Sequence, residues 1–294
     1  MSSTRRVVQY MRFVRRQSAN IAAFAYTMFL FLKSDIGTVI LPTMSLGISL
    51  IGVPEAHALL EGLIWVILHL LAFDVSHSCT CLAPNTKIIG LEEDRLSKPH
   101  RPIAAGRISV QTSQRLHIVL TVASLLDSMR RGLLVHSASF FVLITMYNDG
   151  NFSSFWITKS GIIAVCIGIL CSGVVACFDH DRPLSLTSMH AVILTVLIQA
   201  TTLHAQDFRD MAGDAVIGRK TLPMLLPRAL ARWGIAILLL TWSTILVAFW
   251  DLPAGAALVL YGLAGYTACS FRAGGTICGL LLAWLCHSST VSGQ

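Results

Sequence analysis

The sequence predicts an all-α, polytopic membrane protein with about nine transmembrane helices. Of its 294 residues, 54% are apolar and 13% are charged, whereas about 25% of the residues of an ordinary soluble domain are charged. The mean hydropathy is +0.69. With 22 Lys and Arg and 15 Asp and Glu residues, the chain cannot cover a soluble surface with charge, but a surface that faces lipid needs no such cover. The composition therefore excludes a soluble enzyme, a disordered chain and a disulfide scaffold.

Nine apolar runs approach the roughly 20 residues that an α-helix needs to cross a bilayer. They cover residues 35–52, 57–79, 112–129, 132–147, 159–178, 188–206, 229–250, 254–271 and 274–287. The third and fourth runs are the weakest, because Asp127, Arg130 and Arg131 interrupt them and the connection between them is short.

The chain before the first span combines a basic N-terminus with the apolar run Ile21–Leu32. No small-residue cleavage site follows, as a signal peptide would require, so we expect an uncleaved amphipathic helix at the membrane interface. The predicted organisation is a basic N-terminus with an interfacial helix over 1–34, and one transmembrane domain over 35–294. That domain contains motif loops at 81–108 and 207–228.

The basic residues predict the orientation of the spans. All Lys and Arg residues except Arg130, Arg131 and Arg182 fall on the same side of the membrane as the N-terminus. Since bases collect in cytoplasmic segments, the N-terminus and the motif loops are expected in the cytosol, with the spans in the endoplasmic reticulum membrane. The net charge of +7 does not indicate a nucleic-acid binder, because the bases fall between apolar stretches.

Two acidic segments follow even-numbered spans and therefore share the cytoplasmic side. The first contains Glu92, Glu93 and Asp94, and the second contains Asp207, Asp210 and Asp214. The spacing of three and four residues in the second segment places its carboxylates on one face of a helix. Such a row of anions requires a cation, and hard divalent ions such as Mg2+ bind carboxylate oxygens.

Basic residues accompany both acidic segments. They are Arg95, Lys98 and Arg101 around the first, and Arg209, Arg219 and Lys220 around the second. Mg2+ on carboxylates, flanked by Lys and Arg, is an arrangement that binds a diphosphate. The alternative is a mixed-charge loop that pairs internally. No Gly-rich run leads into Gly-Lys-Ser/Thr, so an ATPase with a phosphate-binding loop is not indicated.

Both segments resemble motifs of the UbiA prenyltransferase superfamily. The second, Gln206–Pro223, reads QDFRDMAGDAVIGRKTLP, and the first, Glu92–Ile103, reads EEDRLSKPHRPI with the Lys-Pro-x-Arg-Pro-Ile tail. The resemblance covers essentially the whole chain. It implies a helical membrane enzyme around a central cavity, in which Mg2+ binds an isoprenyl diphosphate.

The resemblance also implies roles for individual residues. Catalytic roles fall on Asp94, Asp207, Asp210 and Asp214, and the metal ligands would be these residues together with Glu93. Substrate-binding roles fall on Asn85, Arg95, Lys98, Arg101, Arg209, Arg219 and Lys220.

The first motif departs from the pattern of the superfamily, which has Asn followed by Asp four and eight residues later. With Asp94 as the last member, Gly90 occupies the middle position, and either His77 or Asn85 occupies the Asn position. The altered motif resembles a fungal branch that contains membrane-bound sesquiterpene cyclases of the bergamotene-synthase type.

That branch implies ionisation of an isoprenyl diphosphate, with farnesyl diphosphate expected, and cyclisation of the allylic cation to a sesquiterpene. The alternative is prenyl transfer to an aromatic acceptor, and a transporter is a third, weaker reading because the acids lie among bases at a membrane edge. A cyclase needs aromatic faces around the cation. The candidates are Phe73, Tyr147, Phe208, Tyr261 and Tyr266, although ordinary packing also explains each of them.

One stripe of the second span carries ionisable residues at membrane depth. His69, Phe73 and His77 lie on this stripe with Asp74 beside them. Such groups are candidates for a functional site, and the alternative is that they hydrogen-bond to neighbouring helices.

Overall fold

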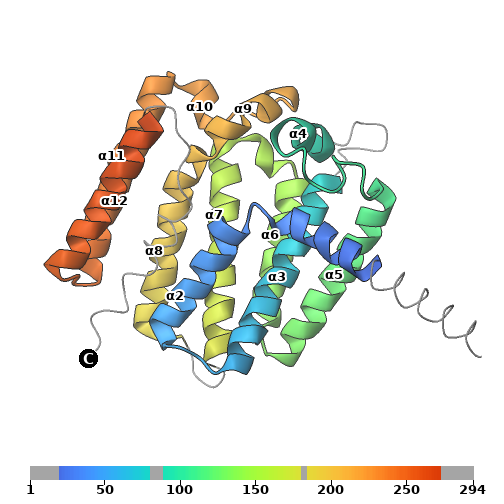
Figure 1. Ribbon diagram of the computed structural model, residues 1–294, viewed down its shortest axis with the longest axis horizontal. Helices are drawn as coiled ribbons and strands as arrows, with labels where there is room; N and C mark the ends of the chain where they lie inside the picture. Colours follow the sequence, from blue (N-terminus) through green and yellow to red (C-terminus); the bar gives the residue numbers. More distant parts are fainter. Residues whose placement is uncertain (1–19, 80–88, 180–183, 273–294) are drawn as a thin grey trace, which may run out of the picture.

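The computed structural model describes residues 20–79, 89–179 and 184–272, which are helical apart from turns and one isolated β-bridge between Phe155 and Lys220. Long helices run side by side, and short helices gather at one end of the bundle (Figure 1). In chain order the labelled elements are η1 (Ile36–Ile40), α2 (Leu41–Ile51), α3 (Ala56–Cys79), α4 (Ile89–Ser97), α5 (Val110–Arg130), α6 (Leu134–Asn148), η2 (Phe152–Ser154), α7 (Trp156–Phe178), α8 (Leu186–Thr202), η3 (Leu203–Ala205), α9 (Asp207–Val216), α10 (Leu222–Leu225), α11 (Arg228–Phe249) and α12 (Ala254–Arg272).

Helix α7 is central to the bundle, since it packs against α2, α3, α6 and α8. Small residues make this possible. At Gly173 an added Cβ would collide with the indole ring of Trp65 on α3. Trp65 is fully buried, and its Nε1 donates a hydrogen bond of 2.7 Å to Ser128 Oγ on α5. The close approach of α7 to α3 therefore depends on the missing side chain at Gly173.

The predicted spans coincide with helices wherever the structure describes them, and the last, 274–287, lies outside the described residues. Five described helices are long and apolar enough to cross a membrane, or six if the bent pair Asn20–Leu32 and Ile36–Ile51 is one span. The nine-span count is therefore not confirmed. The third and fourth predicted spans fall short for physical reasons: α5 carries Arg115 and Asp127 among its polar residues, and α6 is only 15 residues long.

The N-terminal apolar run is helical, as predicted. The helix Asn20–Leu32 is bent by 59° relative to Ile36–Ile51. Ile21, Phe24 and Phe29 are exposed on the shorter helix. These side chains give the helix an apolar surface, which is compatible with the predicted contact with the membrane.

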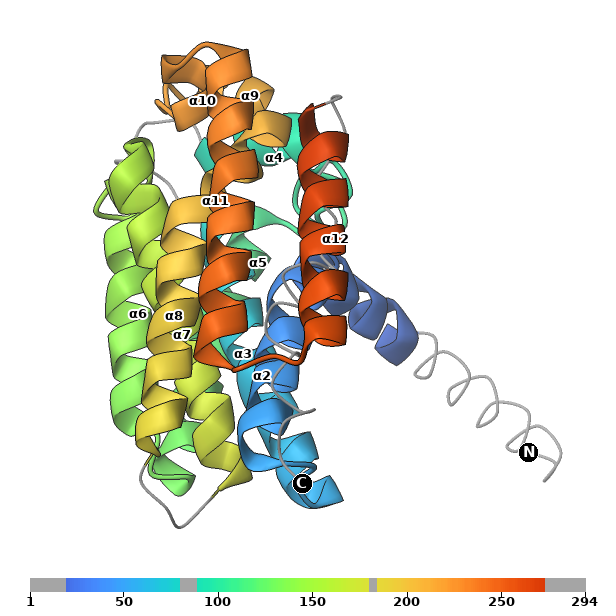
Figure 2. The same cartoon turned by 90° about the vertical axis from the view of Figure 1, so that its left-hand side faces the viewer.

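Helices α11 and α12 form an antiparallel pair at one edge of the bundle, next to α8 (Figures 1 and 2). Their shared core includes Ile235, Leu239 and Leu260, separate from the main core around α3 and α7. Ile198 of α8 belongs to this second core, and residues of both cores line the cavity described below.

The short helices α4, α9 and α10 lie at the same end of the bundle (Figure 1). The two segments expected as motif loops therefore contain helices: α4 lies within 81–108, and α9 and α10 lie within 207–228. Helices α4 and α9 also contact each other. The prediction that the two acidic segments share one side of the protein is confirmed.

We expect the substitution Gly173→Ala to destabilise the protein by about 1–3 kcal/mol, because the new methyl group must displace the Trp65 ring. The matched control is Gly161→Ala in the same helix, where nothing lies within 4 Å of the added Cβ. That control should be neutral or slightly stabilising, since Ala favours helix. Apparent melting temperatures of the two purified variants test this, and equal shifts would contradict the role of Gly173.

Candidate active site

The two acidic segments meet through α4 and α9. Gly213 of α9 lies against α4, where an added Cβ would collide with Ser97 Oγ and approach Glu93. This close contact brings Glu93 to the same place as the acidic face of α9. The two segments, more than 100 residues apart in the chain, therefore form one site.

The carboxylates of α9 lie on its buried face, as their spacing predicts. Asp207, Asp210 and Asp214 are all buried. The Nζ atom of Lys159, in the first turns of α7, lies 2.7 Å from Asp207 Oδ1 and 3.4 Å from Asp214 Oδ2. Burial raises the pKa of Asp207 to about 6, against the opposing effect of Lys159. Lys159 thus offsets the repulsion between two neighbouring acids.

Arg219 connects the two segments. Its Nη1 atom lies 2.8 Å from Asp214 Oδ1 and 3.1 Å from Glu93 Oε2, and the guanidinium is buried. Burial opposes ionisation of Glu93, but His77 and Arg219 outweigh it and hold the pKa of this carboxyl well below its ordinary value. Glu93 is therefore an anion held between α3, α4 and the segment after α9.

A second buried arginine connects α4 to α3. Arg101 Nη2 lies 2.7 Å from Asp74 Oδ1, and Arg101 Nη1 lies 3.2 Å from Asp94 Oδ1. Ser78 Oγ donates a hydrogen bond of 2.6 Å to Asp94 Oδ2. All of these groups are buried. Asp94 is thus fixed by α3 and by the Pro-rich tail of its own segment.

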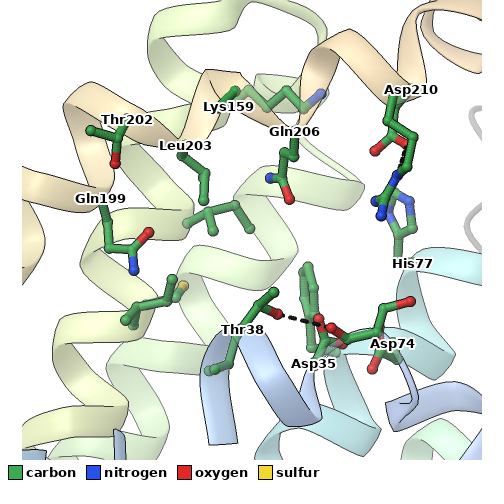
Figure 3. A pocket seen from close by; sticks show the side chains of 18 of the residues that line it. Asp35, Thr38, Asp74, His77, Lys159, Gln199, Thr202, Leu203, Gln206 and Asp210 are labelled. Atoms are coloured by element: carbon green, nitrogen blue, oxygen red, sulfur yellow. Dashed lines mark hydrogen bonds and ion pairs between the residues drawn. The ribbon is translucent and has the colours of Figure 1, made fainter. Parts of the chain in front are cut away.

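Members of these ion pairs line a cavity of about 390 Å³, and Figure 3 shows part of its wall. One end is charged, and Glu93, Lys98, Arg101, Lys159, Asp210 and Arg219 contribute to its wall. The other end is apolar, with Leu70, Phe140, Ile163, Ile167 and Leu170. This distribution of charged and apolar side chains suits a molecule with an anionic head and a hydrocarbon tail.

The predicted site residues occupy three kinds of position. Those that line the cavity are Glu93, Lys98, Arg101, Arg209, Asp210 and Arg219. Those that are buried beside it and do not line it are Asp94, Asp207 and Asp214. Arg95 and Lys220 are exposed and do not line it, and Asn85 lies outside the described residues.

Only some of the aromatic candidates line the cavity. Phe73, Tyr147 and Phe208 line the cavity, and the rings of Phe73 and Tyr147 lie 5.9 Å apart. Tyr261 and Tyr266 are on α12, partly exposed and away from the cavity wall. The prediction that Tyr261 and Tyr266 surround the cation is therefore not supported by the cavity.

Of the ionisable and aromatic residues on the predicted stripe of α3, only some line the cavity. Phe73, Asp74 and His77 line the cavity, whereas His69 is not part of its wall. The Nε2 atom of His69 lies 2.6 Å from Ser137 Oγ on α6. His69 thus belongs to the packing between helices, which is the alternative considered from the sequence.

Sequence reasoning missed two basic residues of the cavity wall. One is Lys159, and the other is Arg232 of α11, whose guanidinium lies 5.0 Å from the ring centroids of Phe208 and Phe271. A signal was present for Lys159, since it is a single lysine where an apolar span begins, on the side of the acidic segments. Arg232 carried no comparable signal.

The donor chemistry at the charged end fits a hard divalent cation. No group of three His, Cys, Asp or Glu side chains converges on one point within the described ranges, because the acids are drawn to Lys159, Arg101 and Arg219 instead. However, Asp207 Oδ2 is buried and accepts no hydrogen bond. A buried carboxylate oxygen without a partner, beside a cavity that further acids line, is a suitable ligand for such an ion.

Comparisons with known proteins agree with this geometry. The model of the UbiA prenyltransferase family matches residues 39–287. A fumagillin β-trans-bergamotene synthase of Aspergillus fumigatus is 35% identical over 232 residues, which are 79% of this chain and 77% of that protein. A polyprenyl transferase of Hericium erinaceus is 32% identical over 150 residues, which are 47% of this chain and 48% of that protein.

A solved structure shares the fold. It is a UbiA homologue from Archaeoglobus fulgidus bound to GPP and Mg2+, with a TM-score of 0.62 and 12% sequence identity. The likeness covers 90% of this chain and 99% of that chain. The arrangement of helices around the cavity is therefore shared with that protein.

We expect Arg219→Met to destabilise the protein by about 3 kcal/mol, because it leaves the anions of Glu93 and Asp214 buried without their shared cation. The apparent melting temperature in detergent should fall by about 6 °C. The control Arg209→Met removes a cation whose side chain is 52% exposed, and it should shift the temperature by no more than about 2 °C. Similar shifts in the two variants would show that Arg219 does not hold the segments together.

Proposed function

Because the chain belongs to the UbiA prenyltransferase family, we propose that it is a membrane-bound terpene cyclase that ionises farnesyl diphosphate with Mg2+ and closes the chain to a sesquiterpene. The observation that carries this proposal is the cavity with one charged and one apolar end. The similarity to a bergamotene synthase over 79% of the chain supports cyclisation as the outcome.

The charged end supports a role in binding the diphosphate. Lys98, Arg101, Lys159 and Arg219 supply positive charge to the cavity wall. Because these cations are partly or fully buried, water screens them little, and their attraction for an anion is stronger than at a protein surface. Charge that develops on the departing diphosphate would be stabilised by the same groups without reorganisation.

Mg2+ would be held by Glu93 and Asp210, whose side chains line the cavity, together with Asp94, Asp207 and Asp214 beside them. When bound, the ion would neutralise negative charge on the leaving diphosphate. The protein contributes the positions of these acids. Lys159, Arg101 and Arg219 pair with the buried carboxylates and offset the repulsion between them.

The apolar end supports a role in folding the hydrocarbon chain. Leu70, Phe140 and Leu170 contribute side chains without charge, so that water is excluded from the allylic cation. Phe73 and Tyr147 add two ring faces near the charged end. Aromatic faces stabilise a cation within about 6 Å, and we expect the allylic cation to form beside these two rings when the diphosphate departs.

Prenyl transfer is the second candidate function. It is favoured by the similarity to a polyprenyl transferase over about half of the chain. In that reaction an aromatic acceptor would attack the same allylic cation. The two functions share the ionisation step and differ in the nucleophile.

The location of the reaction follows from the distribution of bases. With the N-terminus and the acidic segments in the cytosol, the charged end of the cavity would meet a water-soluble diphosphate head, while the apolar end would lie at the depth of the lipid tails. The chain would form one transmembrane domain in the endoplasmic reticulum, preceded by the interfacial helix.

Membranes that contain the protein should convert farnesyl diphosphate and Mg2+ into a cyclic hydrocarbon in the absence of any acceptor, because the substrate's own double bonds act as the nucleophile. Gas chromatography of the volatile products measures this against membranes without the protein. Geranyl and geranylgeranyl diphosphate tested in parallel define the chain length. Product formation only after addition of an aromatic acceptor would overturn the cyclase in favour of prenyl transfer.

Asp210→Asn should lower turnover by at least about 100-fold, since it removes one of the carboxylates that would hold Mg2+ beside the departing diphosphate. The matched control is Asp251→Asn, at an exposed turn between α11 and α12 with a φ of 48°, where Asn is well tolerated. Release of diphosphate is measured for both variants at matched protein amounts. Near-normal turnover of the Asp210 variant would contradict the proposed metal site.

A further inference from the structure

Two carboxyl groups of the cavity wall belong to neither acidic segment. Asp35 precedes η1, at the break of the first helix, and Asp74 lies in the last third of α3. Both residues line the cavity. Their side chains lie within hydrogen-bonding reach of each other, and Figure 3 shows them side by side. Two acids that are 39 positions apart in the chain thus come together at one point of the wall.

Only some of the carboxylate oxygens of Asp35 and Asp74 accept hydrogen bonds. Asp74 is fully buried, and its Oδ1 atom accepts a hydrogen bond of 2.7 Å from Arg101 Nη2. The Oδ2 atoms of Asp35 and Asp74 are buried, and neither accepts a hydrogen bond from an N–H or O–H group. A buried polar atom without a partner is costly. Both residues line the cavity, so a ligand in it would lie beside these carboxyl groups.

The electrostatics of the pair favour the uptake of a proton. Two carboxylates in contact repel each other, and binding one proton between them relieves the repulsion. Arg101 balances only part of the charge, because it also contacts Asp94. The other charged or titratable groups that face this part of the cavity are Lys98 and, farther along the wall, His77 and Glu93.

The Asp35–Asp74 pair lies between the charged end and the apolar end of the cavity. On α3, Asp74 is one turn beyond Leu70 of the apolar end and three residues before His77, which contacts Glu93 at the charged end. Thr38, one turn after Asp35, lines the same wall. A hydrocarbon chain whose head lies at the charged end would therefore pass these carboxylates.

Resting on the cyclase function proposed above, we propose that the Asp35–Asp74 pair is the proton acceptor that ends the cyclisation. A carboxylate oxygen of the pair takes a proton from the carbon next to the cationic centre. The O–H bond forms as the C–H bond breaks, and the electron pair of that C–H bond becomes the double bond of the product. The proton then leaves to water with the departing diphosphate, which restores the anionic pair.

Asp35→Asn is the variant that tests this role. It keeps the size of the side chain but removes a proton acceptor, and it leaves the contact between Asp74 and Arg101 in place. We expect the main alkene to fall by at least about tenfold per diphosphate released, with alcohols and alkenes from other deprotonation sites in its place. Diphosphate release itself should fall much less, since ionisation depends on the charged end.

The experiment uses wild-type protein, Asp35→Asn and the control Asp251→Asn in membranes, and measures diphosphate release and volatile products together. An unchanged product mixture in the Asp35 variant would overturn the proposal and indicate another base, such as the diphosphate. A parallel loss of diphosphate and alkene would also overturn it, because Asp35 would then act before the proton is lost. If wild-type protein releases no hydrocarbon, the cyclase function itself fails, and this proposal with it.

Discussion

Shared cations are the constraint on which the site depends. Each of three buried cations contacts two carboxylates: Lys159 contacts Asp207 and Asp214, Arg219 contacts Glu93 and Asp214, and Arg101 contacts Asp74 and Asp94. Moving one such charge out of water costs several kcal/mol, and only close pairing offsets this cost. The pairs tie α3, α4, α7 and α9 together. The helix ends around the cavity are thus positioned by charge as well as by apolar packing.

The same constraint explains why a diphosphate and a divalent cation belong together in the proposed function. Among the described residues of the charged end, the buried acids outnumber the buried bases. An anionic ligand alone would add to that excess, and its repulsion with Asp210 and Glu93 would oppose binding. A ligand that enters with its own cations reverses the balance. The acids are therefore compatible with an anionic substrate only through an ion between them.

Sequence patterns predicted most of the fold because each depends on local order along the chain. The apolar runs gave the long helices, and the spacing of Asp207, Asp210 and Asp214 gave the buried face of α9. Two contacts of these acids could not be predicted, because Lys159 belongs to α7 and Glu93, which shares Arg219 with Asp214, belongs to α4. Likewise, nothing local connects Asp35 with Asp74. Pairing across helices is set by tertiary contacts, and a single sequence does not show them.

The break in the first helix has a consequence for how the chain enters the membrane. Asn20–Leu32 and Ile36–Ile51 are each shorter than the roughly 20 residues of a single span, and Lys33, Ser34 and Asp35 separate them. During synthesis, neither half is a strong insertion signal by itself. The first half can remain at the interface until α3 arrives, since α3 contacts η1 directly after the break. Membrane integration of this end would then be completed by folding rather than precede it.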